Sequence, residues 1–129
     1  MKIKLSLCFL LLATLIYPLS YAENSLEVEP ILSTRIEISA GEDITITLPA
    51  NPTTGYTWQL AKPLDKTILG ESSSSYVPDR TQQVGSGGRE IWTIKTLKPG
   101  RTKAIFNYLR PWEKETPPVK TITFIIIVK

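Results

Sequence analysis

Three short segments of the 129-residue sequence carry residue types that could bind a partner. They are Asn51–Tyr56 (Asn-Pro-Thr-Thr-Gly-Tyr), Gly85–Gly88 (Gly-Ser-Gly-Gly) and Arg110–Glu113 (Arg-Pro-Trp-Glu). Each lies between runs that alternate apolar and polar residues, and each falls on every second connection between those runs. Since the strands of a β-sandwich run alternately up and down, alternate connections emerge at one end. The sequence therefore predicts a composite binding edge of three loops on a rigid scaffold.

The first segment predicts a narrow, uncharged loop. Pro52 fixes its own φ and pushes Asn51 toward an extended conformation, while Gly55 supplies backbone freedom. Thr53 and Thr54 place two small hydroxyl side chains at the tip. Such a partly preorganised loop could enter a cleft at little cost in conformational entropy. The alternative is a purely structural turn, because Asn-Pro and Thr-Gly are ordinary turn chemistry.

The second segment, Gly85-Ser86-Gly87-Gly88, does not fit a phosphate-binding loop. Such loops precede a helix, and the P-loop also needs a lysine, whereas a β-strand pattern follows here. Two interpretations remain open. The segment is a flexible hairpin tip, or its missing side chains let the backbone approach a partner and form strand-like hydrogen bonds.

The third segment places Trp112 directly after Arg110 and Pro111. Tryptophan and arginine are the residue types most often found as binding hot spots, and a proline-stiffened loop loses little entropy on docking. The alternative is that Trp112 packs onto the end of the scaffold as a cap. Glu113 and Glu115 could suggest paired carboxylates, but nothing else in the sequence supports a two-acid hydrolase.

The N-terminal 22 residues have the pattern of a secretory signal peptide. Lys2 and Lys4 precede an apolar run from Leu5 to Leu19, and the small residues of Ser20–Ala22 predict cleavage after Ala22. The alternative is an uncleaved membrane anchor, which is disfavoured because the apolar run is short for a span of about 20 residues. We therefore expect one domain of residues 23–129, exported to the periplasm, a vesicular lumen or the extracellular medium. We expect it to be a monomer without stable membrane insertion after cleavage.

The composition of residues 23–129 excludes several kinds of chemistry. The only cysteine, Cys8, lies in the leader, and the sequence has no histidine. Catalysis by cysteine or histidine, a disulfide framework and a typical zinc site are therefore excluded, and no cofactor is expected. These 107 residues carry 13 basic and 12 acidic side chains, a net charge of +1. With no basic face, nucleic acid is not an expected partner.

The remaining pattern has a period of two and no sustained helical stripe, which is typical of strands. About seven short strands with frequent turns predict an all-β fold, an immunoglobulin-like antiparallel β-sandwich. Tyr56, Trp58 and Leu60 are predicted to face the core. Residues 61–75 leave open a short connection or one helical turn, followed by a short edge strand at 76–77. The sequence does not explain the second apolar face of the last strand, formed by Ile125 and Ile127.

Taken together, the three segments resemble the chagasin family, secreted or lysosomal inhibitors of papain-like cysteine peptidases. The matching pieces, in the family's order and spacing, are residues 51–56 with Trp58, residues 85–88, and Arg110-Pro111-Trp112. The resemblance implies an immunoglobulin-like fold with these loops at one end. It also implies a reversible, non-covalent block of the peptidase's active-site cleft.

The resemblance further implies a role for each segment. Thr53 and Thr54 would lie over the catalytic cysteine, the segment Gly85–Gly88 would pair through its backbone along one side of the cleft, and Arg110 and Trp112 would grip the other side. Two other classes of protein remain open. One is a secreted adhesin or carbohydrate-binding sandwich that uses Trp112 without inhibiting a peptidase. The other is a hydrolase, which the missing Cys and His chemistry disfavours.

Overall fold

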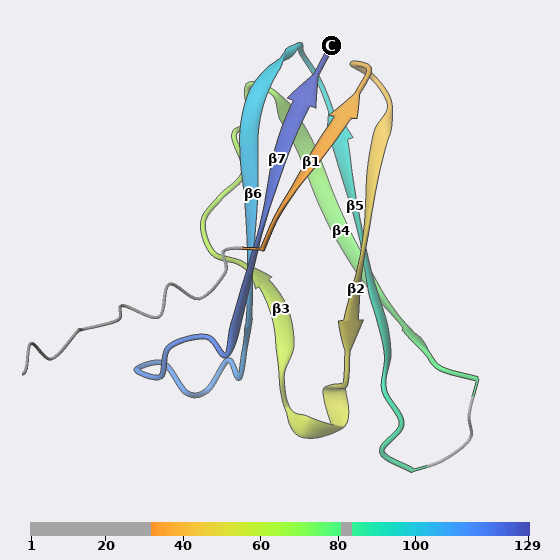
Figure 1. Ribbon diagram of the computed structural model, residues 1–129, viewed down its shortest axis with the longest axis vertical. Coiled ribbons are helices and arrows are strands. Elements are labelled where there is room, and N and C mark those ends of the chain that lie inside the picture. Colours follow the sequence, from red (N-terminus) through yellow and green to blue (C-terminus); the bar gives the residue numbers. More distant parts are fainter. Residues whose placement is uncertain (1–31, 81–83) are drawn as a thin grey trace, which may run out of the picture.

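The structure, a computed structural model, describes residues 32–80 and 84–129, which form seven strands in two sheets (Figure 1). The strands are β1 (Leu32–Ile38), β2 (Asp43–Ala50), β3 (Thr57–Leu60), β4 (Leu69–Pro78), β5 (Gly88–Thr96), β6 (Gly100–Leu109) and β7 (Lys120–Val128). The all-β sandwich prediction is confirmed. The predicted signal peptide lies outside the described residues. Across 32–80 and 84–129, no helix has the length and apolar character needed to cross a bilayer.

One sheet has the strand order β1-β7-β6-β3, and the other has the order β2-β5-β4. Neighbouring strands are antiparallel except for β1 and β7, which pair in parallel from Leu32 opposite Ile122 to Ile38 opposite Val128. In an up-and-down series the first and seventh strands run in the same direction, so they must be parallel when they become neighbours. Both strands therefore run away from the end that carries the three loops.

The core lies between the sheets and follows the predicted alternation. Every second residue of β2, from Ile44 to Ala50, is buried, and so is every second residue of β7, from Ile122 to Val128. Phe106 of β6 is fully buried and meets Trp92 and Phe124 edge-on, with ring centroids 5.0 and 5.8 Å away. This geometry is favourable for aromatic pairs. The core is thus an apolar layer built from both sheets.

The predicted inward face of residues 56–60 is confirmed for Trp58 and Leu60 but not for Tyr56. Trp58 is buried, and Leu60 packs against the core. Tyr56 precedes the first residue of β3 and is only half-buried. Its ring stacks on Tyr108 at a centroid distance of 5.3 Å. Tyr56 therefore belongs to the loop end of the molecule rather than to the core.

The connection between β3 and β4 is a short turn, one of the two predicted alternatives, whereas the strand that follows is longer than predicted. Asp65 organises a tight turn: its carboxylate accepts hydrogen bonds from the hydroxyl and the backbone N–H of Thr67, at 2.6 and 3.0 Å. These bonds, the hydroxyl first, hold the pKa of Asp65 below its usual range. The predicted short edge strand at 76–77 is the end of a ten-residue strand that includes the polar run Ser72–Ser75. A strand at the edge of a sheet tolerates such exposed polar residues.

The second apolar face of β7 is covered by charged neighbours. Ile125 lies between Arg35 of β1 and Lys103 of β6, and Ile127 lies beside Glu37 of β1. Both isoleucines are half-buried. The aliphatic stems of long charged side chains can cover apolar surface while their charges stay in water. Central strand position and charged neighbours together account for two isoleucines on an outer face.

Candidate functional site

The three predicted segments lie in loops at the same end of the sandwich (Figure 1). We call residues 51–56, between β2 and β3, the first loop. The second loop joins β4 to β5 and is described at 79–80 and 84–87, and the third loop, residues 110–119, joins β6 to β7. Two side chains connect them: Asn51 Nδ2 donates to the carbonyl of Gly85 at 3.2 Å, and Arg110 Nε donates to the carbonyl of Thr54 at 3.1 Å. The three loops therefore form one connected edge.

The first loop is a single turn of 3₁₀ helix, Pro52–Thr54, with a polar cap. The Asn51 side chain accepts a hydrogen bond from the backbone N–H of Thr53, and Pro52 occupies the first helical position, where no N–H is needed. The hydroxyl of Thr53 donates to Asn51 Oδ1, and the hydroxyl of Thr54 donates to the Asn51 carbonyl at 2.7 Å. Both hydroxyls are thus used within the loop, which is uncharged and preorganised.

Gly55 ends this turn in the left-handed region, with φ of 83°, and lies directly against Trp112. A Cβ atom at Gly55 would be 2.3 Å from Cη2 of Trp112, much closer than carbon atoms approach. The position thus requires glycine for its backbone conformation and for its contact with the third loop.

We expect Gly55→Ala to lower the free energy of unfolding by about 1–3 kcal/mol, the usual cost of a non-glycine residue in such a conformation. The added methyl group must also displace Trp112. Thermal unfolding measures the first effect, and the indole N–H resonance of Trp112 in a ¹H–¹⁵N spectrum reports the second. Gly41→Ala is the matched control, because Gly41 has φ of 90° but nothing within 4 Å of its Cβ position. An unshifted Trp112 resonance in Gly55→Ala would contradict the contact.

The glycines of the second segment do not all have the same role. Gly88 is the first residue of β5 and is buried, and a Cβ atom there would lie 2.3 Å from the carbonyl oxygen of Val77. Its missing side chain therefore serves the close approach of β4 rather than an exposed surface. Gly87 and Ser86 are half-buried, and Gly85 is exposed at the tip, where its carbonyl accepts the bond from Asn51.

The third loop keeps its arginine turned toward the first loop. The Arg110 guanidinium lies 4.4 Å from the centre of the Tyr56 ring, and its Nη1 donates to Glu113 Oε1 at 3.1 Å. Together with the bond to the Thr54 carbonyl, these contacts hold the Arg110 guanidinium in place. Arg110 therefore connects the third loop to the first. Trp112 touches Gly55 but remains 66% exposed, and Pro111 is exposed. Packing of Trp112 as a cap on the scaffold therefore explains only the part of its surface that meets Gly55.

Large exposed apolar side chains gather at this end. Among the described residues five stand out, and four of them lie on or beside the loops: Tyr76, Val84, Trp112 and Val119, with Leu97 elsewhere. Val84 and Val119 were not among the residues predicted for the site. Their positions were the available signal, since each directly adjoins a strand or glycine segment at this end. Exposed apolar groups concentrated at one end mark an interaction surface.

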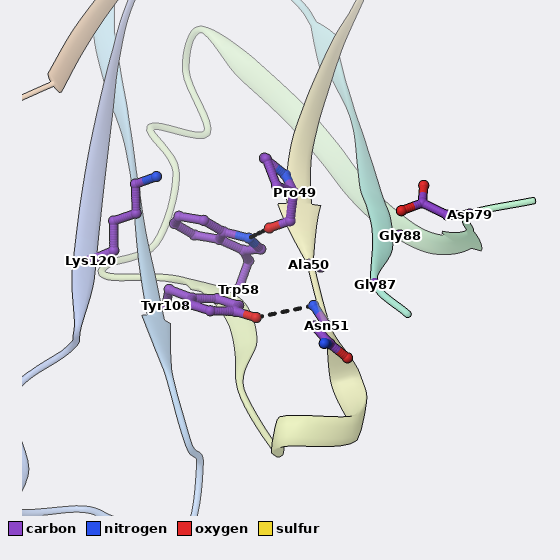
Figure 2. Close-up of a pocket in the computed structure, with 9 residues that line it drawn as sticks. All are labelled: Pro49, Ala50, Asn51, Trp58, Asp79, Gly87, Gly88, Tyr108 and Lys120. Atoms are coloured by element: carbon purple, nitrogen blue, oxygen red, sulfur yellow. Dashed lines mark hydrogen bonds between the residues drawn. The ribbon is translucent and has the colours of Figure 1, made fainter. Parts of the chain in front are cut away.

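An open pocket of about 400 Å³ lies beneath the first and second loops (Figure 2). Its walls include Pro49, Trp58 and Tyr108, with Lys120 to one side. Two hydrogen bonds frame it: Trp58 Nε1 donates to the Pro49 carbonyl at 2.9 Å, and the Asn51 N–H donates to the Tyr108 hydroxyl at 3.1 Å. In residues 32–80 and 84–129, no cluster of three or more acidic, cysteine or histidine side chains could hold a metal ion.

A stiff sandwich with three connected loops and exposed apolar groups at one end defines a protein that binds another protein through its loops. Comparison with known proteins identifies the family: residues 37–126 match the model of the chagasin family peptidase inhibitor I42, and the chain belongs to that family. Amoebiasin-2 of Entamoeba histolytica is 32% identical to it over 94 residues, which cover 73% of this chain and 76% of that protein.

Solved structures agree with this assignment. The cysteine protease inhibitor EhICP2 from Entamoeba histolytica has a TM-score of 0.62 and 27% identity, and the match covers 76% of this chain and 93% of that one. PbICP-C, solved in complex with falcipain-2, has a TM-score of 0.50 and 25% identity, with 76% and 87% covered. The resemblance stated from the three segments is therefore confirmed at the level of family and fold.

Proposed function

We propose that this protein is a reversible, non-covalent inhibitor of papain-like cysteine peptidases that blocks the active-site cleft with its three loops. One observation carries the proposal: a member of the chagasin family of peptidase inhibitors presents all three loops at one end, joined by the bonds from Asn51 to Gly85 and from Arg110 to Thr54. The relative EhICP2 is a cysteine protease inhibitor, and PbICP-C forms a complex with falcipain-2. The protein is therefore not an enzyme.

The first loop is suited to occupy a cleft without reacting there. It is narrow and uncharged, and its backbone is fixed by the Asn51 cap, the Pro52 ring and the Gly55 turn. Preorganisation reduces the entropy lost on binding. In this proposal Thr53 and Thr54 lie closest to the catalytic cysteine, and inhibition follows because substrate is excluded. No bond of the inhibitor needs to be cut.

The other two loops extend the contact on either side of the first. The second loop contributes Val84 and the exposed backbone of Gly85, and the third loop contributes Pro111 and Trp112. Protein–protein interfaces of standard size bury about 1,600 Å² in total, and area alone does not fix affinity. We expect the exposed indole of Trp112 to supply most of the binding energy on its side.

The sugar-binding alternative receives less support from the structure. Carbohydrate-binding sandwiches of the kind considered would need a row of exposed aromatic side chains. Trp58 is buried, Trp92 packs against the core, and only Trp112 among the three tryptophans is strongly exposed. The pattern fits a hot spot in a protein interface better than a sugar platform.

The direct test is a titration of the protein comprising residues 23–129 against papain and a panel of cathepsin-like enzymes. We expect stoichiometric loss of activity that recovers on dilution, and intact inhibitor in a mass spectrum after prolonged incubation. Full activity of every enzyme in the panel, with inhibitor shown to be folded, would reject the proposal.

We also propose that the protein is exported and that its leader ends at Ala22. Support comes from the basic start, the apolar run and the small residues of the N-terminal sequence. N-terminal sequencing of protein recovered outside the cytoplasm should begin at Glu23. A sequence that still begins at Met1 would contradict leader cleavage.

A further inference from the structure

Glu90 is a buried acidic residue outside the three loops. It lies on β5, two residues after Gly88, and is only 9% exposed. The only other buried polar or charged residue among those described is Thr96, at the far end of the same strand. None of the ion pairs found in residues 32–80 and 84–129 involves Glu90. Burying a carboxylate without a cation costs free energy, so the hydrogen bonds of Glu90 must offset that cost.

The two oxygens of Glu90 connect the two sheets. Oε1 accepts a hydrogen bond from Trp92 Nε1 at 2.9 Å, within β5, and Oε2 accepts one from the backbone N–H of Trp58 at 3.4 Å, on β3. Trp58 in turn donates its indole N–H to the carbonyl of Pro49 at 2.9 Å. Trp58 therefore joins the two strands that carry the first loop, and Glu90 joins them to the strand that follows the second loop.

The first and second loops are thus connected at two levels. At the tips, Asn51 Nδ2 donates to the Gly85 carbonyl, and at the base, the Trp58 N–H donates to Glu90. An open pocket of about 400 Å³ lies beside these bonds, with Ala50 and Gly87 in its walls (Figure 2). The backbone ladder between β2 and β5 continues to Ala50 opposite Gly88, so it already holds the start of the first loop beside the end of the second loop. The end of the first loop leads into β3, in the other sheet, and the bond from the Trp58 N–H to Glu90 ties that strand to β5.

We propose that Glu90 is a positioning residue: its carboxylate holds the start of β3, and with it the end of the first loop, against the sheet that carries the second loop, and so sets the affinity for the peptidase without touching the enzyme. This inference rests on the proposed function. Leucine would fill a similar volume without burying a charge. The leucine variant would lose both acceptors, and with them the bond from the Trp58 N–H that links β3 to β5 across the sandwich.

Glu90→Gln tests the proposal because the amide replaces one of the two acceptor oxygens by an NH2 group, which would point a donor at either the Trp92 or the Trp58 N–H. We expect the inhibition constant against papain to rise about tenfold in Glu90→Gln, and further in Glu90→Leu, which has no acceptor. If Glu90→Leu does not fold, the glutamine variant carries the test alone.

Thr96→Val is the matched control. Its hydroxyl donates to the Glu42 carbonyl at 2.6 Å and accepts from the Gly41 N–H at 3.0 Å, so valine also removes buried hydrogen bonds, but at the end away from the loops. We expect a comparable fall in melting temperature with an unchanged inhibition constant. The proposal would be overturned if Glu90→Gln and Thr96→Val both raised the inhibition constant in proportion to their fall in melting temperature.

A second measurement separates this inference from the proposed function. In a ¹H–¹⁵N spectrum of the free protein, Glu90→Gln should shift the amide signals of both Thr53–Gly55 and Gly85–Gly87, whereas Thr96→Val should not. Unshifted loop signals in Glu90→Gln would reject the positioning role even if the wild type inhibits. If the wild type inhibits no peptidase while the signals shift as expected, the proposed function fails and the structural role of Glu90 stands.

Discussion

Replacement of Thr54 by glutamate should weaken inhibition of papain by about 100-fold or more, equivalent to about 2.7 kcal/mol. Thr54 lies at the exposed tip of the first loop, where the proposed contact with the peptidase is tightest. The nucleophile of these enzymes is a thiolate, so a carboxylate beside it meets a like charge in a site that excludes water. Juxtaposed like charges and unpaired buried charges each cost several kcal/mol.

The substitution should leave the fold intact. The side chain of Thr54 makes one bond, from its hydroxyl to the Asn51 carbonyl, whereas its backbone carbonyl still accepts from Arg110. Thr54→Gln is the matched control, since it adds nearly the same volume without the charge. We expect glutamine to weaken inhibition less than glutamate and both variants to melt near the wild-type temperature. Full potency of Thr54→Glu would show that the first loop does not enter the cleft.

Trp112→Ala should raise the inhibition constant about 30-fold, a loss of about 2 kcal/mol. The indole is 66% exposed, and the part in contact with the protein rests on Gly55. A large, rigid, mostly exposed aromatic group can bury much area in a partner while losing little conformational freedom. The measurement is the inhibition constant against papain, with melting temperature recorded in parallel.

Two further variants make the Trp112 result specific. Leu97→Ala removes another exposed apolar side chain, 52% exposed, that lies outside the three loops, and should leave inhibition unchanged. Trp112→Phe keeps an aromatic ring and should recover part of the lost affinity. If Trp112→Ala inhibits as well as the wild type, the third loop does not anchor the complex through its indole. The exposed Val119 would then become the better candidate on that side.

Period-two patterning was enough to predict the sandwich and the meeting of the three loops. Strands such as β2, where burial alternates strictly from Asp43 to Ala50, leave little ambiguity about which residues face the core. Once strands alternate up and down, the end at which each loop emerges follows. The local chemistry of the first loop was also predictable, since the asparagine, proline and glycine each have one strong backbone preference.

What the sequence did not reveal depends on contacts between distant residues. The serine run Ser72–Ser75 has no apolar alternation, so nothing local identifies it as strand, yet pairing with β5 makes it one. The parallel pairing of β1 with β7 is equally invisible to local patterns. Glu90 looks like one more surface acid until β3 is placed opposite β5. In each case the structure depends on a strand or residue that is distant in the sequence.

The loop edge is held by hydrogen bonds, one ion pair and contacts of aromatic rings, and no disulfide contributes, because the one cysteine of the sequence, Cys8, precedes every described residue. A peptidase with a catalytic thiolate loses activity once that sulfur is oxidised, so it works only where reductant is plentiful. A scaffold whose shape owes nothing to sulfur keeps the same geometry in that medium. A reductant that keeps the catalytic sulfur of the peptidase reduced therefore leaves the binding loops of the inhibitor unchanged.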